Sequence, residues 1–328
     1  MIYLHTLPEE ISRISVSECS RISKDLFSHF LANLKQLQIS DDLSSQLNDI
    51  YVPLAASLVA KAKQQQAPLI VGINGAQGSG KSTLCTLLET ILREGFGLRT
   101  TSFSIDDLYC TRAERKVLGK KIHPLLASRG VPGTHDIKLG VERLKQLSIQ
   151  EPGHQVSIPV FDKALDDRSS EENWRLVTTP FDMVLFEGWC VGARPQEDAM
   201  LAAPVNELEA NEDPQGIWRA YVNQRLRDDY AELFERLNLL IMLQVPGMEC
   251  VLEWRSLQEH KLAMRHKDTG TNKIMNQDEL QRFIMHYERL THHMLGEMPN
   301  YADIVLRMNR EHLIDGVGVN SSPGIKYP

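Results

Sequence analysis

One glycine-rich segment constrains this chain more than any other feature. Residues 75–82 read GAQGSGKS and match the pattern G-x-x-x-x-G-K-[ST] in full. An apolar stretch of strand length precedes the segment at residues 69–73, and an amphipathic helical stretch follows it at residues 82–92. Glycines let a backbone wrap closely around phosphate oxygens, with its N–H groups pointing inward at a helix N-terminus. The pattern therefore predicts a loop that binds a nucleotide triphosphate.

The residue types in this loop indicate how the triphosphate is held. Lys81 is expected to reach the β- and γ-phosphates, and the Ser82 hydroxyl to coordinate Mg²⁺. The only Asn-Lys pair, at residues 272–273, lacks the Asp that would read guanine. ATP is therefore the expected nucleotide. The predicted nucleotide-binding residues are Gly75, Ala76, Gln77, Gly78, Ser79, Gly80, Lys81, Ser82 and Thr83.

Apolar runs of strand length alternate with helical stretches from residue 68 onward. This alternation is typical of βαβ units and predicts an α/β fold with a parallel sheet, buried on both faces. The region before it shows apolar residues at helical spacing and predicts an N-terminal helical layer. The expected helices there span residues 25–37 and 50–62, and the expected strands span residues 69–73, 100–105, 183–186, 239–244 and 304–307.

The same pattern predicts the organisation of the chain. We expect a helical extension over residues 1–66, a nucleotide-binding domain over residues 67–320 and a tail over residues 321–328. Two irregular segments, at about residues 120–136 and 156–175, are expected to be insertions that face the substrate. Residues 193–214, rich in Ala, Glu, Asn and Pro, are expected to form a surface loop.

Carboxylates follow two of the predicted strands. Asp106 and Asp107 come after residues 100–105, and Glu187 comes after residues 183–186. Ligands of such sheets bind at the carboxyl ends of the strands, so both ends should lie beside the phosphate loop. Phosphoryl transfer needs a group that receives the hydroxyl proton, and we assign Asp106 to that role, with Asp107 as the alternative. Glu187 is expected to hold Mg²⁺ directly or through water; Asp107 is a weaker metal candidate.

The same carboxylates have a structural alternative, because Asp106 and Asp107 could cap a helix without any chemistry. Residues close to the two strand ends are candidates to contact a substrate, namely Tyr109 and, as the best candidate among the tryptophans, Trp189. A helix is predicted over residues 249–266 and could belong to a lid spanning residues 249–276. Its Arg255 would then neutralise the transferring phosphoryl group; a solvated helix face is the alternative.

Composition excludes several classes of protein. The 328 residues carry a net charge of -7, which does not favour nucleic acid or an anionic membrane as a partner. The five cysteines are far apart, as in a protein with reduced thiols. No apolar run is long enough to span a bilayer and the N-terminus does not look like a signal peptide, so a soluble, cytoplasmic protein is expected. The oligomeric state is not predicted.

As a set, these motifs resemble those of a known group of kinases. The phosphate loop, IDDLY after the second strand and LFEGW at the third resemble the phosphoribulokinase, uridine kinase and pantothenate kinase group. The chain is similar in more detail to the plant-type D-glycerate 3-kinases and their bacterial and fungal kinase-like relatives. That resemblance covers about residues 51–313 and rests on VGINGAQGSGKSTL, SIDDLY, RGVPGTHD, PVFDKALDDR, FEGWCVG, EWRSLQEHKL and HYERLTHHMLGEMPNYAD.

The resemblance implies a P-loop NTPase fold, with a five-stranded parallel sheet flanked by helices, and a kinase that uses ATP and Mg²⁺. It implies Asp106 as base and Glu187 as the Walker B acid. It also implies a pocket for a small, hydroxylated, anionic acceptor, best represented by D-glycerate, that would be lined by Arg129, His135, Asp136, Asp162, Lys163 and Arg168. The chain departs from the family at Ala164, which replaces a serine, and in lacking the glycines that follow.

Two further functions remain open. One is a kinase of the same superfamily that acts on a nucleoside, a sugar phosphate or pantothenate. The other is a protein that uses ATP as a regulatory switch and has no small acceptor. The expected substrate-facing insertions and Asp106 favour a metabolite kinase over the switch.

Overall fold

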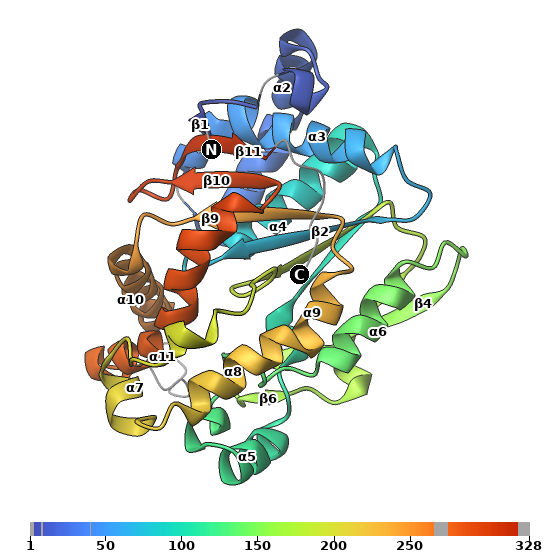
Figure 1. Cartoon of the computed structure of the whole chain (residues 1–328). Helices are drawn as coiled ribbons and strands as arrows, with labels where there is room; N and C mark the ends of the chain where they lie inside the picture. Colours follow the sequence, from blue (N-terminus) through green and yellow to red (C-terminus); the bar gives the residue numbers. More distant parts are fainter. Residues whose placement is uncertain (1–2, 8, 40, 266–274, 321–328) are drawn as a thin grey trace.

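A computed structural model describes residues 3–7, 9–39, 41–265 and 275–320. Its centre is a seven-stranded sheet of order β1-β11-β10-β9-β2-β8-β3 (Figure 1). The five strands from β10 to β3 are parallel to one another, which confirms the predicted parallel sheet. These five strands are β2 (Leu69–Gly75), β3 (Thr100–Ser104), β8 (Met183–Gly188), β9 (Leu239–Gln244) and β10 (Ile304–Met308).

Two short strands that the sequence did not indicate extend the sheet on one side. The strand β11 (Ile314–Val319) forms an antiparallel hairpin with β10, and β1 (Tyr3–Leu4) pairs with β11. The N-terminal region was predicted to be helical throughout, and this is wrong at its start. Its first described residues form a strand that completes the sheet. Two residues are too few to show any periodicity, and the glycines of β11 weaken its strand pattern.

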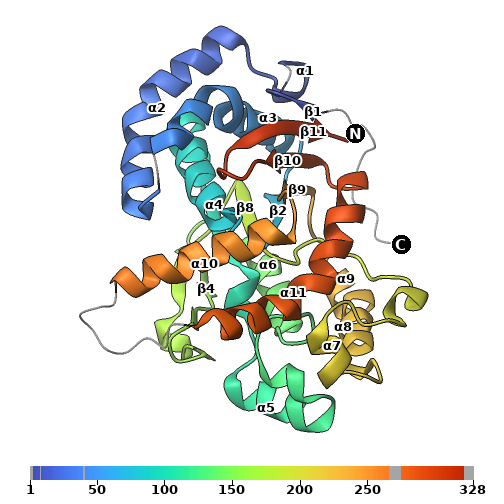
Figure 2. The ribbon, with the colours of Figure 1, turned by 90° about the vertical axis from the view of Figure 1, so that its left-hand side faces the viewer.

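Helices cover both faces of the sheet, as predicted (Figures 1 and 2). Alternate side chains of β2 enter opposite cores: Val71 packs into one apolar cluster and Ile70 into the other. The first cluster contains side chains of α2 (Val16–Leu37), α3 (Val52–Ala62) and α4 (Lys81–Thr90). The second contains side chains of α6 (Ile137–Leu147), α9 (Asp229–Phe234) and α11 (Gln277–Glu297).

The N-terminal helices pack directly on the nucleotide-binding half. In α2, Ile22, Leu26, Phe30 and Leu34 are buried at a spacing of four residues, so one stripe of the helix faces the core. Ser15 caps the helix by accepting a hydrogen bond from the N–H of Glu18. The predicted helices are therefore present, although α2 begins well before residue 25. A short helix, α1 (Glu9–Ser12), precedes it.

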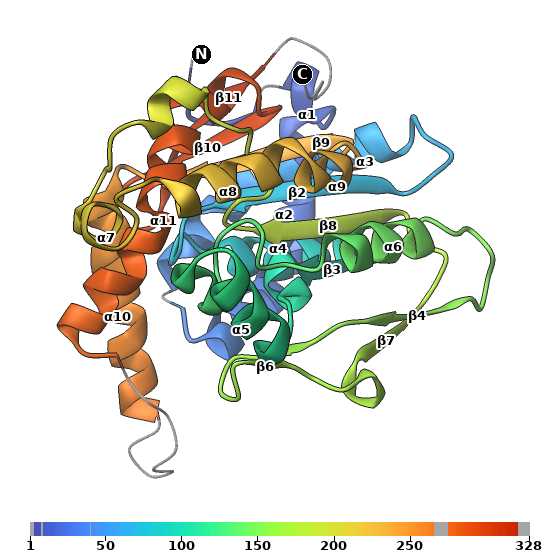
Figure 3. The same ribbon diagram turned by 60° about the horizontal axis from the view of Figure 1, so that its bottom comes forward.

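The chain between β3 and β8 contains both segments predicted to face the substrate, at about residues 120–136 and 156–175 (Figure 3). It contains α5 (Arg112–Lys121), α6 and a ribbon of β4 (Gln155–Ile158) with β7 (Arg175–Thr178). Inside this ribbon, the two-residue strands β5 (Phe161–Asp162) and β6 (Asp167–Arg168) pair with each other. Residues 161–168 are called the Lys163 hairpin below.

The segment of residues 193–214 is only in part the surface loop that its composition predicted, because its last third is helical and partly buried. It contains α7 (Glu207–Glu212), which is followed by α8 (Ile217–Arg227). Glu209 of α7 is fully buried and forms an ion pair with Arg289 of α11 at 2.6 Å. A tertiary ion pair therefore orders a polar segment that lacks an apolar pattern of its own.

The predicted lid helix is present as α10 (Met248–Arg265), which lies beside α11 (Figure 2). The rest of the predicted lid, residues 266–274, and the predicted tail, residues 321–328, lie outside the described residues. None of the helices in the described ranges has the length and apolar character that crossing a bilayer requires.

Candidate active site

The predicted phosphate loop joins the end of β2 to the start of α4. Gly78 and Gly80 have positive φ angles of 78° and 89°, a backbone conformation that favours glycine. A methyl group on Gly75 would lie 2.6 Å from the Ser79 Oγ, so that position has no room for a larger residue. The loop therefore has the curved shape that its glycines predicted.

Polar groups inside this loop are ready for a ligand. The Lys81 Nζ donates to the carbonyl oxygen of Ala76 at 3.1 Å. Burial lowers the pKa of Lys81, against the opposing charges of Glu187 and Asp106. Among the described residues, the buried Ser79 Oγ has no hydrogen-bond partner. A phosphate oxygen in the loop would provide an acceptor both for this hydroxyl and for the lysine.

The carboxyl ends of the neighbouring strands meet beside the loop. In the sheet register, Glu187 of β8 is opposite both Ile73 of β2 and Ser104 of β3. The Ser82 Oγ donates to the Glu187 Oε1 at 2.9 Å, so the two predicted metal ligands are in contact. A carboxylate and a hydroxyl are suitable oxygen ligands for Mg²⁺.

Asp106 follows β3 in the short turn of residues 105–108 and lies at the same site. Its Oδ2 accepts a hydrogen bond from the Lys163 Nζ at 2.8 Å. Burial raises the pKa of Asp106, but Lys163, Lys81 and His135 together outweigh burial and lower it. The carboxylate is therefore ionised at neutral pH, with one lysine from the phosphate loop and one from the Lys163 hairpin near it.

Asp107 points to different partners. Its Oδ2 accepts from the backbone N–H of Ser104 and its Oδ1 from that of Phe161, both at 3.3 Å. Burial raises the pKa of Asp107 to about 6. Asp107 therefore caps the turn that carries Asp106 and holds the Lys163 hairpin, so the capping alternative describes Asp107 rather than Asp106. Its weaker assignment as a metal ligand stays a prediction.

The segment of residues 129–136 lies alongside the turn that carries Asp106. Tyr109 and His135 form an antiparallel bridge, and their rings stack with centroids 4.4 Å apart. The His135 Nδ1 is hydrogen-bonded to the Tyr230 hydroxyl, and burial lowers the pKa of His135 to about 3. The Trp189 Nε1 donates to the carbonyl oxygen of Gly130, so Trp189 holds this segment from β8.

The charged residues predicted to line the acceptor pocket fall into two groups. Asp136, Asp162 and Arg168 bind protein groups: Asp136 caps α6 and pairs with Arg168, while Asp162 accepts from two N–H groups of its own turn. Lys163 reaches Asp106, and Arg129 pairs with Asp166. Lys163 is therefore the cation of this set that contacts the candidate base Asp106; all of these acceptor roles stay predictions.

The helix α10 covers the phosphate loop. A methyl group on Gly78 would lie 3.0 Å from the Trp254 Cβ and 3.5 Å from the backbone nitrogen of Arg255. The Arg255 guanidinium lies over the Phe283 ring, 5.4 Å from its centroid. The backbone of Arg255 is thus next to the loop, whereas its guanidinium packs on Phe283; its role as a lid arginine stays a prediction.

Sequence reasoning did not identify two residues near this site, Arg115 and Asp166. Arg115 is fully buried and donates to the Asp166 carboxylate at 2.7 Å. Its helix reads RAERKVLGKK, a highly charged pattern that is typical of a solvated helix, so nothing in the sequence distinguishes this arginine.

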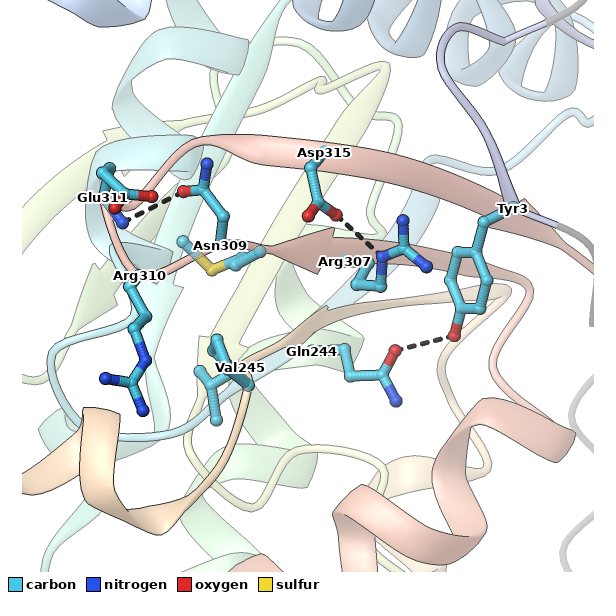
Figure 4. Close-up of a pocket in the computed structure, with 10 residues that line it drawn as sticks. Tyr3, Gln244, Val245, Arg307, Asn309, Arg310, Glu311 and Asp315 are labelled. Carbon is cyan, nitrogen blue, oxygen red and sulfur yellow. Dashed lines mark hydrogen bonds and ion pairs between the residues drawn. The ribbon is translucent and has the colours of Figure 1, made fainter.

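A cavity of about 650 Å³ lies at the carboxyl ends of β9 and β10 (Figure 4). Its charged and polar walls are largely paired within the protein: Arg307 binds Asp315, and the Tyr3 hydroxyl donates to Gln244. None of the predicted site residues lines this cavity. We therefore do not assign the chemistry to it.

Comparison with known proteins agrees with this arrangement, although no model of a known protein family matches the sequence. An uncharacterised kinase of Schizosaccharomyces pombe is 32% identical over 283 residues, which are 81% of this chain and 98% of that protein. The chloroplastic D-glycerate 3-kinase of Arabidopsis thaliana is 26% identical over 290 residues, covering 83% of this chain but only 60% of the plant protein's length.

A solved structure leads to the same group. The D-glycerate 3-kinase of Cryptococcus neoformans superposes on this chain with a TM-score of 0.67 at 26% identity, over 81% of this chain and 96% of the fungal one. Sequence similarity across most of the chain therefore accompanies a shared fold. The chain belongs to the family of nucleotide-binding P-loop kinases that includes the D-glycerate 3-kinases and their fungal relatives.

Proposed function

We propose that this kinase transfers the γ-phosphoryl group of ATP to a hydroxyl of a small anionic hydroxy acid, with D-glycerate as the best candidate. The observation that carries the proposal is the Asp106 carboxylate, which follows β3 beside the phosphate loop and accepts a hydrogen bond from Lys163 of the insertion at 2.8 Å. A protein that uses ATP only as a switch has no acceptor, and it would not need a lysine of the insertion beside this carboxylate.

The residues of the phosphate loop fit ATP and Mg²⁺. The unpartnered Ser79 hydroxyl and the Lys81 ammonium suit phosphate oxygens, and the contacting Ser82 and Glu187 suit one Mg²⁺. No group of three or more His, Cys, Asp or Glu side chains suited to a metal occurs in the described part of the chain. That agrees with a Mg²⁺ that takes most of its ligands from phosphates and water. The ion would neutralise charge on the β- and γ-phosphates.

Asp106 is the proposed general base. As the acceptor oxygen forms its bond to the γ-phosphorus and the bond from this phosphorus to the bridging oxygen of ADP breaks, the hydroxyl proton passes to the Asp106 carboxylate. The lowered pKa of Asp106 keeps the carboxylate ionised and ready to accept that proton. Lys81 would offset the negative charge of the phosphoryl group during transfer.

The preference for an anionic acceptor is supported by the cations of the insertion. Lys163 and Arg129 offer charge-assisted hydrogen bonds to a substrate carboxylate, and Lys163 is also in contact with the proposed base. A carboxylate bound by Lys163 would bring a hydroxyl of the same small molecule, such as the 3-hydroxyl of glycerate, close to Asp106. The relatives named D-glycerate 3-kinase add support for glycerate in particular.

An ATP-consumption assay across a panel of acceptors tests the proposal. The panel contains D-glycerate, related hydroxy acids, nucleosides, sugars, sugar phosphates and pantothenate, with mass spectrometry of each product. We expect the largest kcat/KM with D-glycerate and a loss of roughly 10²–10⁴-fold in the Asp106→Asn variant, which controls for contaminating kinases. A preference for neutral sugars or nucleosides would refute the anionic acceptor. ATP hydrolysis that no acceptor stimulates would favour a nucleotide switch.

A further inference from the structure

The position of Lys163 depends on a hairpin that has little stability of its own. Its two strands contain two residues each, and a ribbon this short is marginal in water. The Lys163 side chain is 65% exposed, so packing does not hold it over Asp106. Contacts from other parts of the chain must therefore determine where this lysine lies.

One of these contacts comes from Arg115, a buried residue of α5. The helix α5 lies beside β6 in Figure 3. The Arg115 side chain is 0% exposed. The guanidinium donates to the carbonyl oxygen of Cys110 at 3.0 Å, to that of Asp166 at 2.9 Å and to the Asp166 Oδ2 at 2.7 Å. A buried charge is unfavourable unless it is paired and hydrogen-bonded, and here the hairpin supplies most of the partners.

Asp166 is the hairpin's half of this contact. It is a non-glycine residue with a positive φ of 54°, a conformation that is strained for an L-residue and needs support from its surroundings. Its second carboxylate oxygen accepts from Arg129. The guanidinium groups of Arg115 and Arg129 both lie over the Phe161 ring, 5.5 and 5.4 Å from its centroid. Two arginines and one aromatic ring therefore fix the turn that carries Lys163.

We propose that Arg115 and Asp166 are positioning residues, which hold the Lys163 hairpin so that Lys163 meets Asp106 and the carboxylate of the acceptor. This inference rests on the proposed function for the identity of the acceptor. Arg115 is fully buried and would act through Asp166. Through the contact between Arg115 and Asp166, α5 would therefore influence both the ionisation of Asp106 and the recognition of the acceptor.

The Asp166→Asn variant tests the proposal. Asn keeps the size of the side chain but removes the charge that both arginines bind. The anchors from Asp107 to the Phe161 N–H and from Asp167 to the Arg112 N–H remain, so the fold is expected to persist. Arg115→Lys keeps the charge but loses the forked geometry, and is expected to give a smaller effect. Glu171→Gln removes an exposed carboxylate of the same insertion and is the matched control.

Three measurements distinguish positioning from a general loss of stability. In Asp166→Asn we expect the acceptor KM to rise about 10-fold while the ATP KM changes less than about 2-fold. The acid limb of the kcat/KM profile should move to higher pH, because a displaced Lys163 no longer lowers the pKa of Asp106. Adding Asp166→Asn to Lys163→Met should change the acceptor KM little further, because both act through one contact.

Hydrogen exchange of the amides of residues 161–168 provides a readout that does not require an acceptor. Protection should fall in Asp166→Asn and Arg115→Lys and stay unchanged in Glu171→Gln. Unchanged protection, an unmoved acid limb, or independent effects of Asp166→Asn and Lys163→Met would each overturn the positioning role. Failure of the proposed function itself would appear separately, as wild-type protein that phosphorylates no hydroxy acid.

Discussion

The phosphate loop and the Lys163 hairpin each present a lysine to the same site, but they hold it in different ways. Lys81 begins α4 directly after a tight loop that leaves β2, so local backbone geometry determines its place. Lys163 lies on a hairpin held by Asp107 and Arg115, residues that are about 50 positions away in the chain. The nucleotide half of the site is therefore a local structure, whereas the proposed acceptor half depends on distant side-chain pairs.

This difference has a functional consequence. A loop made of glycines and backbone N–H groups recognises phosphate, which is the same in every nucleotide triphosphate. A hairpin held by ion pairs can be changed by single substitutions while the sheet stays intact. We therefore expect substitutions in the hairpin to change the choice of acceptor, and substitutions in the loop to change nucleotide binding.

The largest expected effect is at Asp106, where the two halves meet. Asp106→Asn should lower kcat by roughly 10²–10⁴-fold, the usual contribution of a general base. Nucleotide affinity, measured by equilibrium titration, should be nearly unchanged, because Asp106 lies outside the phosphate loop. Turnover at the wild-type rate would remove Asp106 from the mechanism and leave the two halves without a shared group.

A substitution within the loop should separate nucleotide binding from acceptor binding. Gly78→Ala forces an L-residue into a left-handed conformation and places a methyl group 3.0 Å from the Trp254 Cβ. We expect about a 10-fold loss of nucleotide affinity, from strain of about 1–2 kcal/mol, with little change in the acceptor KM.

A matched control for that variant is Gly153→Ala. Gly153 also has a positive φ, of 86°, but a methyl group there would meet nothing within 4 Å. It should lose similar stability in thermal melts and keep wild-type nucleotide affinity. Equal loss of affinity in both variants would show that the effect comes from general destabilisation rather than from the loop.

Removal of the positive charge of Lys163 should affect the acceptor half alone. In Lys163→Met, the carboxylate of Asp106 loses a partner that lowers its pKa, so this pKa should rise. The base is active when it is ionised, and the acid limb of kcat/KM should therefore move to higher pH. The profile is measured with saturating ATP. A limb that stays in place would show that Lys163 does not control the base.

The last expected effect concerns Asp107 and the stability of the fold rather than the reaction. Burial raises its pKa to about 6, above the ordinary value of 3.8, so the folded protein binds the proton more tightly. Stability should therefore fall as the pH rises between about 4 and 6, by about 1–3 kcal/mol at most. Asp107→Asn should remove this dependence in urea unfolding. A slope that persists in the variant would assign the effect to other groups.

The phosphate loop, the parallel strands and the carboxylates at their ends could be predicted from the sequence. Gly75 to Ser82 form a contiguous pattern, and residues such as Asp106 and Glu187 directly follow apolar strands. Strands that are parallel in one sheet end at the same edge, so their order along the chain was enough to bring those residues together. The helix α10 could also be predicted from the sequence, but its position over the loop required the additional hypothesis that it belongs to a lid.

Tertiary structure alone decided the edge of the sheet and the acceptor half of the site. The strand β1 is too short to show a period, and α7 is ordered by the buried pair of Glu209 with Arg289 rather than by an apolar face. Arg115 looks solvated in its helix but is buried against Asp166. Periodicity records which face of a local element is apolar; it does not record which distant charge a side chain will meet. The phosphate loop was therefore visible in the sequence, whereas the residues that position the second lysine were not.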